Sequence, residues 1–251
     1  MRQVATERAL ADLERLQGQL VVSCQAREEN PLHGPLFMAA MAKAAVLGGA
    51  AGIRADGVAD ISAIRAAIGP DRPIVGIAKV KTADGSLFIT PSAESARTVI
   101  AAGASLVALD GTPRPRPGGE SLREVVAAIH VAGGAALADV GTFDDARYAV
   151  DCGVDAVGTT LSGYTPDSPH LEGPDLPLLE RLAGECPVPA FAEGRIWTPD
   201  EARQALALGA SFVVVGTAIT NPTAITARFV AAIAPKRAMP AGSSSRADVR
   251  S

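Results

Sequence analysis

The sequence predicts a single eight-stranded β/α barrel, and three observations support this prediction. Short β-rich runs alternate with Ala-rich amphipathic segments along most of the 251 residues. Several of these segments end in glycine, which commonly ends a helix before the next strand. The length is typical of one such barrel, and an apolar content of 48% with only 4% aromatic residues suits closely packed parallel strands. An open, doubly wound sheet is the alternative arrangement.

The elements follow one another without a linker. We expect an extra helix at Thr6–Gln17 that covers the bottom of the barrel. The eight runs expected to form strands are Leu20–Cys24, Ala51–Arg54, Ile74–Lys79, Leu106–Asp110, Ala135–Asp139, Ala156–Thr160, Val188–Glu193 and Phe212–Gly216. The helices expected between them include Phe37–Leu47, Ser92–Ala101, Leu122–Val131, Phe143–Asp151, Leu176–Ala183 and Pro199–Leu208. The barrel domain would span residues 1–233, and the small, polar and Pro-rich residues of 234–251 predict a disordered tail.

Charge and composition exclude several classes of protein. The net charge of −4 provides no broad basic field for nucleic acid, so the expected partner is a small molecule. The N-terminus has no continuous apolar region of a secretory signal, and no stretch is long enough to span a membrane, so we expect a cytoplasmic protein. The three cysteines and three histidines lack metal-ligand spacing, and they indicate neither disulfides nor structural zinc.

The residues that end the expected strands are the candidates for chemistry, because these ends point into the catalytic mouth of a barrel. They are Ser23, Gln25, Arg54, Lys79, Asp110, Asp139, Thr160 and Glu193. Five of them are charged, with both signs present, which favours a site over ordinary strand ends. Lys79 follows an apolar run, and burial there would make its neutral amine available as a base or as a Schiff-base nucleophile. The alternative is a solvated lysine at the start of a loop.

The acidic strand ends allow several roles. Glu193 could donate or accept a proton, or it could form an ion pair with Arg195 or Arg54 that orders the rim. Asp139 could bind sugar hydroxyls, orient Lys79, or cap the following helix.

An anion site is expected after the last two strands. Gly194 lets the backbone turn sharply and approach a ligand, and Gly216 and Thr217 open a helix N-terminus with exposed N–H groups. The corresponding loops commonly hold phosphate in barrels of this kind. An ordinary helix cap is the alternative reading.

Together these residues resemble the N-acetylmannosamine-6-phosphate 2-epimerase family, also called N-acylglucosamine-6-phosphate 2-epimerases. The match runs from Leu20 to about Ile233, and its most specific elements are Ser-Gly-Tyr-Thr at 162–165 and Ala-Glu-Gly-Arg at 192–195. Further elements are Val-Ser-Cys-Gln at 22–25, Gly-Ile-Arg-Ala at 52–55, Gly-Ile-Ala-Lys at 76–79, Ile-Thr-Pro at 89–91, Ala-Leu-Asp at 108–110 and Val-Val-Gly-Thr-Ala-Ile-Thr at 214–220.

The resemblance implies an isomerase of amino sugar and sialic acid catabolism, which converts N-acetylmannosamine 6-phosphate into N-acetylglucosamine 6-phosphate by epimerisation at C2. It implies that Lys79 is the base at C2 and that Glu193 assists ring opening or stabilises the intermediate, with no metal or organic cofactor. It further assigns contacts with the sugar to Gln25, Arg54, Asp139, Tyr164 and Arg195, and contacts with the phosphate to Gly194, Gly216 and Thr217.

Other readings remain open. Asn221 stands where many relatives carry an arginine, which bears on how the phosphate is bound. A barrel that uses Lys79 as a Schiff-base lysine, such as an aldolase or a lyase, is one alternative function. A non-catalytic barrel that binds phosphosugars is another. A homodimer is an expectation drawn from the tendency of outer helices in such barrels to pair.

Overall fold

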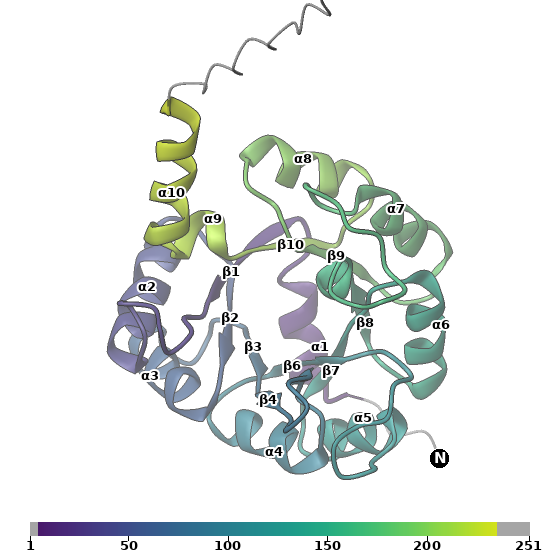
Figure 1. Ribbon diagram of the computed structural model, residues 1–251. Coiled ribbons are helices and arrows are strands. Elements are labelled where there is room, and N and C mark those ends of the chain that lie inside the picture. Colours follow the sequence, from purple (N-terminus) through teal and green to yellow (C-terminus); the bar gives the residue numbers. More distant parts are fainter. Residues whose placement is uncertain (1–4, 235–251) are drawn as a thin grey trace, which may run out of the picture.

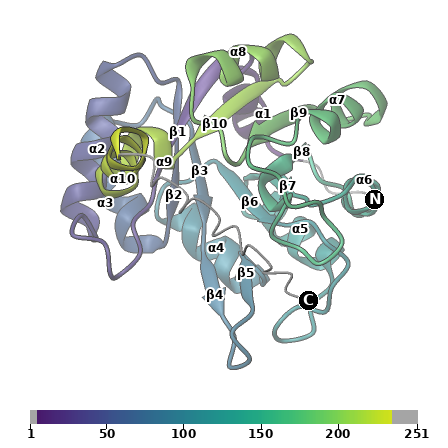
Figure 2. The same ribbon diagram turned by 45° about the horizontal axis from the view of Figure 1, so that its top comes forward.

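A computed structural model describes residues 5–234, and these residues form a closed parallel barrel surrounded by helices (Figures 1 and 2). The strands lie around the barrel in the order β1-β10-β9-β8-β7-β6-β3-β2. Their bounds are β1 Gln19–Cys24, β2 Gly52–Asp56, β3 Ile74–Ile77, β6 Leu106–Asp110, β7 Ala135–Asp139, β8 Ala156–Gly158, β9 Ala190–Glu193 and β10 Phe212–Val215. The predicted fold is confirmed, since the sheet closes where β1 pairs with both β2 and β10.

The helices that accompany the strands have the expected order. Their bounds are α1 Glu7–Glu14, α2 Pro35–Leu47, α3 Val58–Ile68, α4 Ala93–Ala101, α5 Leu122–Val131, α6 Phe143–Cys152, α7 Leu176–Glu185, α8 Pro199–Ala207, α9 Thr217–Thr220 and α10 Pro222–Ile233. The glycines predicted to stop helices adopt positive φ at Gly49, Gly103, Gly153 and Gly209, a conformation that residues with a Cβ rarely adopt. The predicted tail lies outside the described residues from position 235 onward.

Two layers of apolar side chains stabilise this arrangement. One lies between the barrel wall and the helices, and the other fills the barrel interior. Inside the barrel the rings of Phe191 and Phe212 stack with centroids 4.9 Å apart. Gly158 leaves room for this stack, because a Cβ at that position would lie 2.1 Å from the Phe191 ring. The barrel is therefore a packed core, and chemistry is confined to its ends.

The third expected strand differs from the structure. It ends at Ile77, and Lys79 instead begins β4 (Lys79–Lys81), which pairs antiparallel with β5 (Leu87–Ile89) in a hairpin outside the barrel wall. The connection contains Asp84 and Gly85, and Gly85 adopts a φ of 88° in the turn. The predicted range Ile74–Lys79 was thus wrong at its end. The sixth expected strand also ends early, at Gly158, and Thr159–Leu161 form a 3-10 turn.

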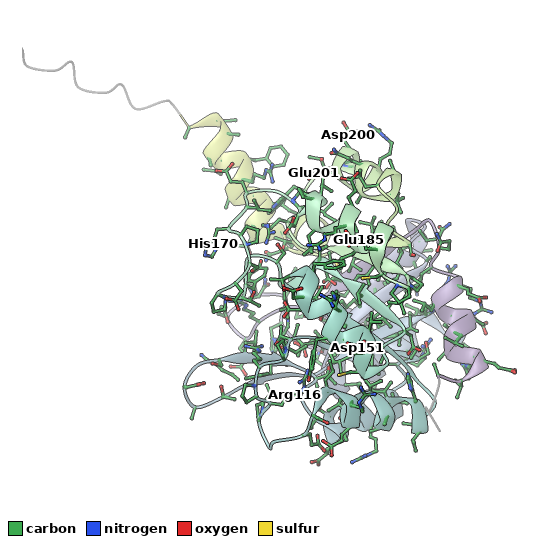
Figure 3. The ribbon with its side chains drawn as sticks, turned by 90° about the vertical axis from the view of Figure 1, so that its right-hand side faces the viewer. Arg116, Asp151, His170, Glu185, Asp200 and Glu201 are labelled. Carbon is green, nitrogen blue, oxygen red and sulfur yellow. The ribbon has the colours of Figure 1, made fainter. Side chains whose placement is uncertain are left out.

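The last helix is unusual because it extends away from the barrel (Figure 1). No residue of α10 is buried, and Phe229, Val230 and Ile233 are exposed. Figure 3, which views the molecule from the right-hand side of Figure 1, labels Asp200 and Glu201 in the acidic first turn of α8. Among the described residues, no helix has the length and apolar character that crossing a membrane requires.

Candidate active site

A buried arginine connects two of the predicted site residues at the carboxyl ends of the strands. Arg54 of β2 donates to both carboxylate oxygens of Asp139 on β7, at 2.6 and 3.0 Å, and to Glu193 Oε2 on β9, at 2.6 Å. Its side chain is 1% exposed. Burial by itself lowers the pKa of Arg54, but the charges of Asp139 and Glu193 more than compensate and raise it above its ordinary value. The three residues form one charged cluster in the barrel mouth.

Glu193 has the electrostatics of a group that exchanges protons near neutral pH. Burial raises its pKa to about 7, and the nearby Asp139 carboxylate also raises it, whereas the charges of Arg54 and Lys79 and a hydrogen bond from Thr160 lower it. Its backbone is held by the Thr159 hydroxyl, which accepts from Glu193 N and donates to Glu193 O. The fixed backbone orients the carboxylate into the mouth beside Arg54.

Lys79 lies at the same mouth but is more open than the sequence predicted. Its side chain is 34% exposed, and its ammonium donates to Gln25 Oε1 and lies 3.5 Å from Asp56 Oδ2. Gln25 in turn donates to Ser23 Oγ at 2.7 Å. The suggestion that Asp139 orients Lys79 was wrong, because Asp139 is bound to Arg54 and Thr160 instead. Gln25 and Asp56 orient the lysine.

The residues predicted to bind phosphate follow two adjacent strands. β9 and β10 pair with Val214 opposite Glu193, so Gly194 and Gly216 begin neighbouring loops. Gly194 has a φ of 110°, and a Cβ there would meet only carbonyl oxygens at 3.9 Å. Thr217 is the first residue of α9. The N–H groups that donate to Gly216 O belong to later residues of this helix, Ile219 and Thr220. Asn221 caps the next helix, with its Oδ1 accepting from Ala224 N at 3.1 Å.

Arg195 and Tyr164 belong to the rim of the mouth. Arg195 donates to Gly173 O at 2.7 Å and to Ser162 O at 2.5 Å. Its guanidinium therefore stabilises the loop after β8 through two backbone carbonyl groups. Its Cζ lies 6.0 Å from the centre of the Tyr164 ring, which is 70% exposed. The predicted alternative of an ion pair between Glu193 and Arg195 is not what forms, since Glu193 pairs with Arg54.

Two further residues at the mouth were given no specific role from the sequence, although Thr160 was among the strand-end candidates. Asp56 ends β2 two residues beyond the expected end of that strand, and alternation along the strand from Arg54 was the signal that could have identified it. Thr160 donates to Asp139 Oδ1 at 2.6 Å and to Glu193 Oε2 at 3.3 Å. Asp110, a strand-end candidate, instead binds Thr112 and Arg114 within its own loop.

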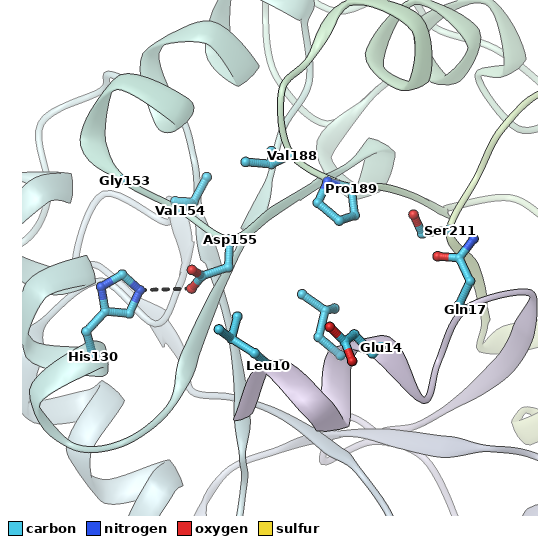
Figure 4. Close-up of a pocket in the computed structure, with 11 residues that line it drawn as sticks. Leu10, Glu14, Gln17, His130, Gly153, Val154, Asp155, Val188, Pro189 and Ser211 are labelled. Atoms are coloured by element: carbon cyan, nitrogen blue, oxygen red, sulfur yellow. Dashed lines mark hydrogen bonds and ion pairs between the residues drawn. The ribbon is translucent and has the colours of Figure 1, made fainter. Parts of the chain in front are cut away.

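A separate cavity lies at the opposite end of the barrel (Figure 4). It measures about 410 Å³ and is lined by α1 and by residues that precede β8, β9 and β10. Its lining includes several polar residues, among them His130, whose Nε2 lies 2.8 Å from Asp155 Oδ2. None of the predicted site residues lines it. Within residues 5–234, no group of three His, Cys, Asp or Glu side chains is placed to hold a metal ion.

A closed parallel barrel with an ionisable cluster at the carboxyl ends of its strands defines the chain as a β/α-barrel enzyme. Residues 38–235 match the model of the family described as "Putative N-acetylmannosamine-6-phosphate epimerase". The chain belongs to this family, and the resemblance found in the sequence is confirmed.

Individual relatives cover nearly the whole chain. A protein from Clostridioides difficile is 45% identical over 88% of this chain and 98% of its own length, and one from Caldanaerobacter subterraneus is 48% identical over 90% and 95%. Both are named "Putative N-acetylmannosamine-6-phosphate 2-epimerase". The solved structure of the N-acetylmannosamine-6-phosphate 2-epimerase from Clostridium perfringens is similar with a TM-score of 0.85 at 43% identity, covering 88% of this chain and 96% of that one.

Proposed function

We propose that this enzyme interconverts N-acetylmannosamine 6-phosphate and N-acetylglucosamine 6-phosphate by moving a proton at C2. The observation that carries the proposal is that Lys79 and the Glu193 carboxylate, whose pKa is raised to about 7, lie in the same mouth of the barrel. Glu193 is close enough to Lys79 for the lysine charge to lower its pKa, while burial raises it to about 7. The identity of the substrate is taken from family membership, because the relatives are named as N-acetylmannosamine-6-phosphate epimerases.

The chemistry follows from the acidity of the substrate. In the open-chain sugar the C2 proton is α to the C1 aldehyde, so its removal gives an enolate that can be reprotonated on either face. Lys79 removes this proton and exchanges it with water, and it returns a solvent-derived proton to the opposite face of C2 once the enolate has turned that face towards the lysine. Glu193, which is half ionised near pH 7, exchanges a proton with the ring oxygen or the C1 oxygen.

The remaining contacts hold the sugar. Gln25, Arg54 and Asp139 contact the hydroxyls and the N-acyl group, with Tyr164 and Arg195 at the rim. Gly194, Gly216 and Thr217 bind the phosphate through backbone N–H groups, which need no side-chain charge. Binding of the phosphate by backbone N–H groups is compatible with an uncharged residue at position 221, where Asn221 caps α10.

The decisive experiment incubates the protein with N-acetylmannosamine 6-phosphate in D₂O and follows C1 and C2 by NMR. We expect N-acetylglucosamine 6-phosphate to appear with deuterium at C2. Absence of turnover at saturating substrate would reject the proposal. Lys79→Ala should abolish the exchange with the fold retained, whereas Lys81→Ala, on the same strand β4, should leave it intact. If borohydride traps a covalent adduct of Lys79 with the substrate, the Schiff-base alternative replaces this one.

We also propose that the protein is a homodimer. Phe229, Val230 and Ile233 of α10 are 69%, 58% and 80% exposed, and a second copy of the chain is the partner that would cover them. Sedimentation analysis should give a dimer for the wild type and a monomer for Phe229→Asp. A monomeric wild type at micromolar concentration would contradict the proposal.

We place the reaction in the cytoplasm. Cys24, Cys152 and Cys186 are unpaired thiols, which suits a reducing compartment. Fractionation of cells that make the protein should recover it with the cytoplasmic enzymes.

A further inference from the structure

Thr90, which directly follows β5, has a backbone conformation that needs an explanation. Its φ is 46°, and among the described residues only Arg195 is another non-glycine residue with positive φ. A β-branched residue is a rare occupant of this region, and such a conformation persists only where the surrounding structure fixes it. The Thr90 side chain is buried, with 0% exposure. The motif Ile-Thr-Pro at 89–91 has no role in the site described above.

Thr90 is fixed by two hydrogen bonds to Ala78, the residue next to Lys79, and by one to the barrel wall. Thr90 N donates to Ala78 O at 2.8 Å, and Ala78 N donates to the Thr90 hydroxyl at 3.1 Å. The hydroxyl donates onward to Ala108 O on β6, at 2.7 Å. Both backbone polar groups of Ala78 are therefore bound to one residue, which is itself attached to the barrel wall.

This attachment lies where the chain leaves the barrel. The pairing of β3 with β6 ends at Gly76 opposite Val107, and Lys79 already belongs to the hairpin, where it lies opposite Ile89. Without the hydroxyl bridge, Ala78 N would lose its hydrogen bond at this point. The path of the backbone into Lys79 therefore depends on two contacts. One is the Thr90 bridge, and the other is with Asp56, whose Oδ1 accepts from Lys79 N at 3.0 Å.

We infer that Thr90 is a positioning residue for Lys79, an inference that rests on the proposed role of Lys79 as the base at C2. Thr90 acts through the backbone of Ala78. It sets the place of the lysine relative to the substrate, which is anchored on the other side of the mouth by the loops after β9 and β10. A displacement of the base by about 1 Å can lower a rate by about a hundredfold.

The test uses Thr90→Val, which keeps the β-branched shape and removes the hydroxyl. We expect kcat to fall about a hundredfold while KM changes little, because the phosphate contacts are untouched. Thr90→Ser restores the hydroxyl and should restore kcat to within a few-fold of the wild type. Thr82→Val is the matched control, since it removes a threonine hydroxyl from the turn of the same hairpin, where Thr82 binds Asp84 and Ser86. It should leave kcat unchanged.

A second readout does not depend on catalysis. Amide hydrogen exchange of the segment 74–81 should accelerate in Thr90→Val, because the Ala78 N–H loses its acceptor, and should stay at the wild-type rate in Thr82→Val. If Thr90→Val does not fold, Thr90→Gly takes its place, since glycine accepts a φ of 46° without strain and also lacks the hydroxyl.

The outcomes separate this inference from the proposed function. Wild-type kcat in a folded Thr90→Val or Thr90→Gly variant, with Lys79→Ala inactive, would overturn the positioning role and leave the function standing. A raised KM at unchanged kcat would overturn it as well, because Thr90 would then contribute to substrate binding. Full activity of Lys79→Ala would reject Lys79 as the base, whatever the exchange data show.

Discussion

Arg54 on β2 forms a buried, two-pronged ion pair with Asp139 on β7, at 2.6 and 3.0 Å across the interior of the barrel. The guanidinium also reaches Glu193, so one cation compensates two carboxylates. Removal of one partner of a buried ion pair leaves an uncompensated charge, which costs far more than an exposed pair contributes.

The first prediction concerns this arginine. Arg54→Ala should lower the free energy of unfolding by about 3–5 kcal/mol, because Asp139 and Glu193 would remain buried without their cation. Arg54→Lys should recover part of the loss, since lysine keeps the charge but lacks the planar fork that binds both oxygens of Asp139. Urea denaturation at neutral pH measures both values. Equal stability of the Ala variant and the wild type would contradict the charge balance described here.

The second prediction concerns pH. The pKa of Glu193 is raised from its ordinary value to about 7, so between those values the folded protein binds a proton that the unfolded chain has released. The contribution of Glu193 to stability is therefore largest at low pH and falls as pH rises through this window. In Glu193→Gln that fall should disappear, so urea denaturation between about pH 5 and pH 8 should give a flatter profile than in the wild type.

Activity should respond to the same group. Glu193→Gln should reduce kcat/KM by about a hundredfold or more, because an amide does not act as a general acid or base near neutral pH. The wild-type pH–rate profile should carry an inflection near pH 7 that the variant lacks. An unchanged profile would assign the inflection to another group.

The third prediction concerns the packing under the site. Gly158→Ala should destabilise the protein by about 1–3 kcal/mol, because the added methyl overlaps the Phe191 ring that stacks on Phe212. Gly184→Ala, in α7, is the matched control. No atom beyond its chain neighbours and its own helix backbone lies within 4 Å of its added Cβ, and alanine in a helix should stabilise by about 0.5–1 kcal/mol. Thermal or urea unfolding of the two variants should shift in opposite directions.

The fourth prediction concerns Asn221. Asn221→Ala should destabilise the first turn of α10 by about 1 kcal/mol, because Ala224 N loses its capping acceptor. Asn221→Ser retains a capping oxygen and should behave like the wild type. Amide exchange in α10 is the measurement, and identical exchange in the Ala and Ser variants would show that the cap does not stabilise the helix.

Much of the architecture could be predicted because it depends on local patterns. Glycines such as Gly153 and Gly209 marked the helix ends, since few other residues adopt the positive φ required there. The strand ends pointed to Arg54, Asp139 and Glu193 as members of one site because parallel strands in a barrel present their carboxyl ends at one mouth. Family membership could also be read from the motifs that these residues form.

The sequence by itself thus predicted the barrel, the order of its strands, and most residues of its mouth, but not the β4–β5 hairpin or Asp56. Only the tertiary structure decided which of those residues interact. Arg54 and Asp139 are 85 positions apart and Arg54 and Glu193 are 139 positions apart, so no local pattern records their pairing. Likewise, a Thr90 hydroxyl that joins Ala78 to Ala108 appears only when the hairpin folds against β6. Periodicity fixes which face a residue occupies, whereas the partner on that face depends on how the closed barrel brings distant strands together.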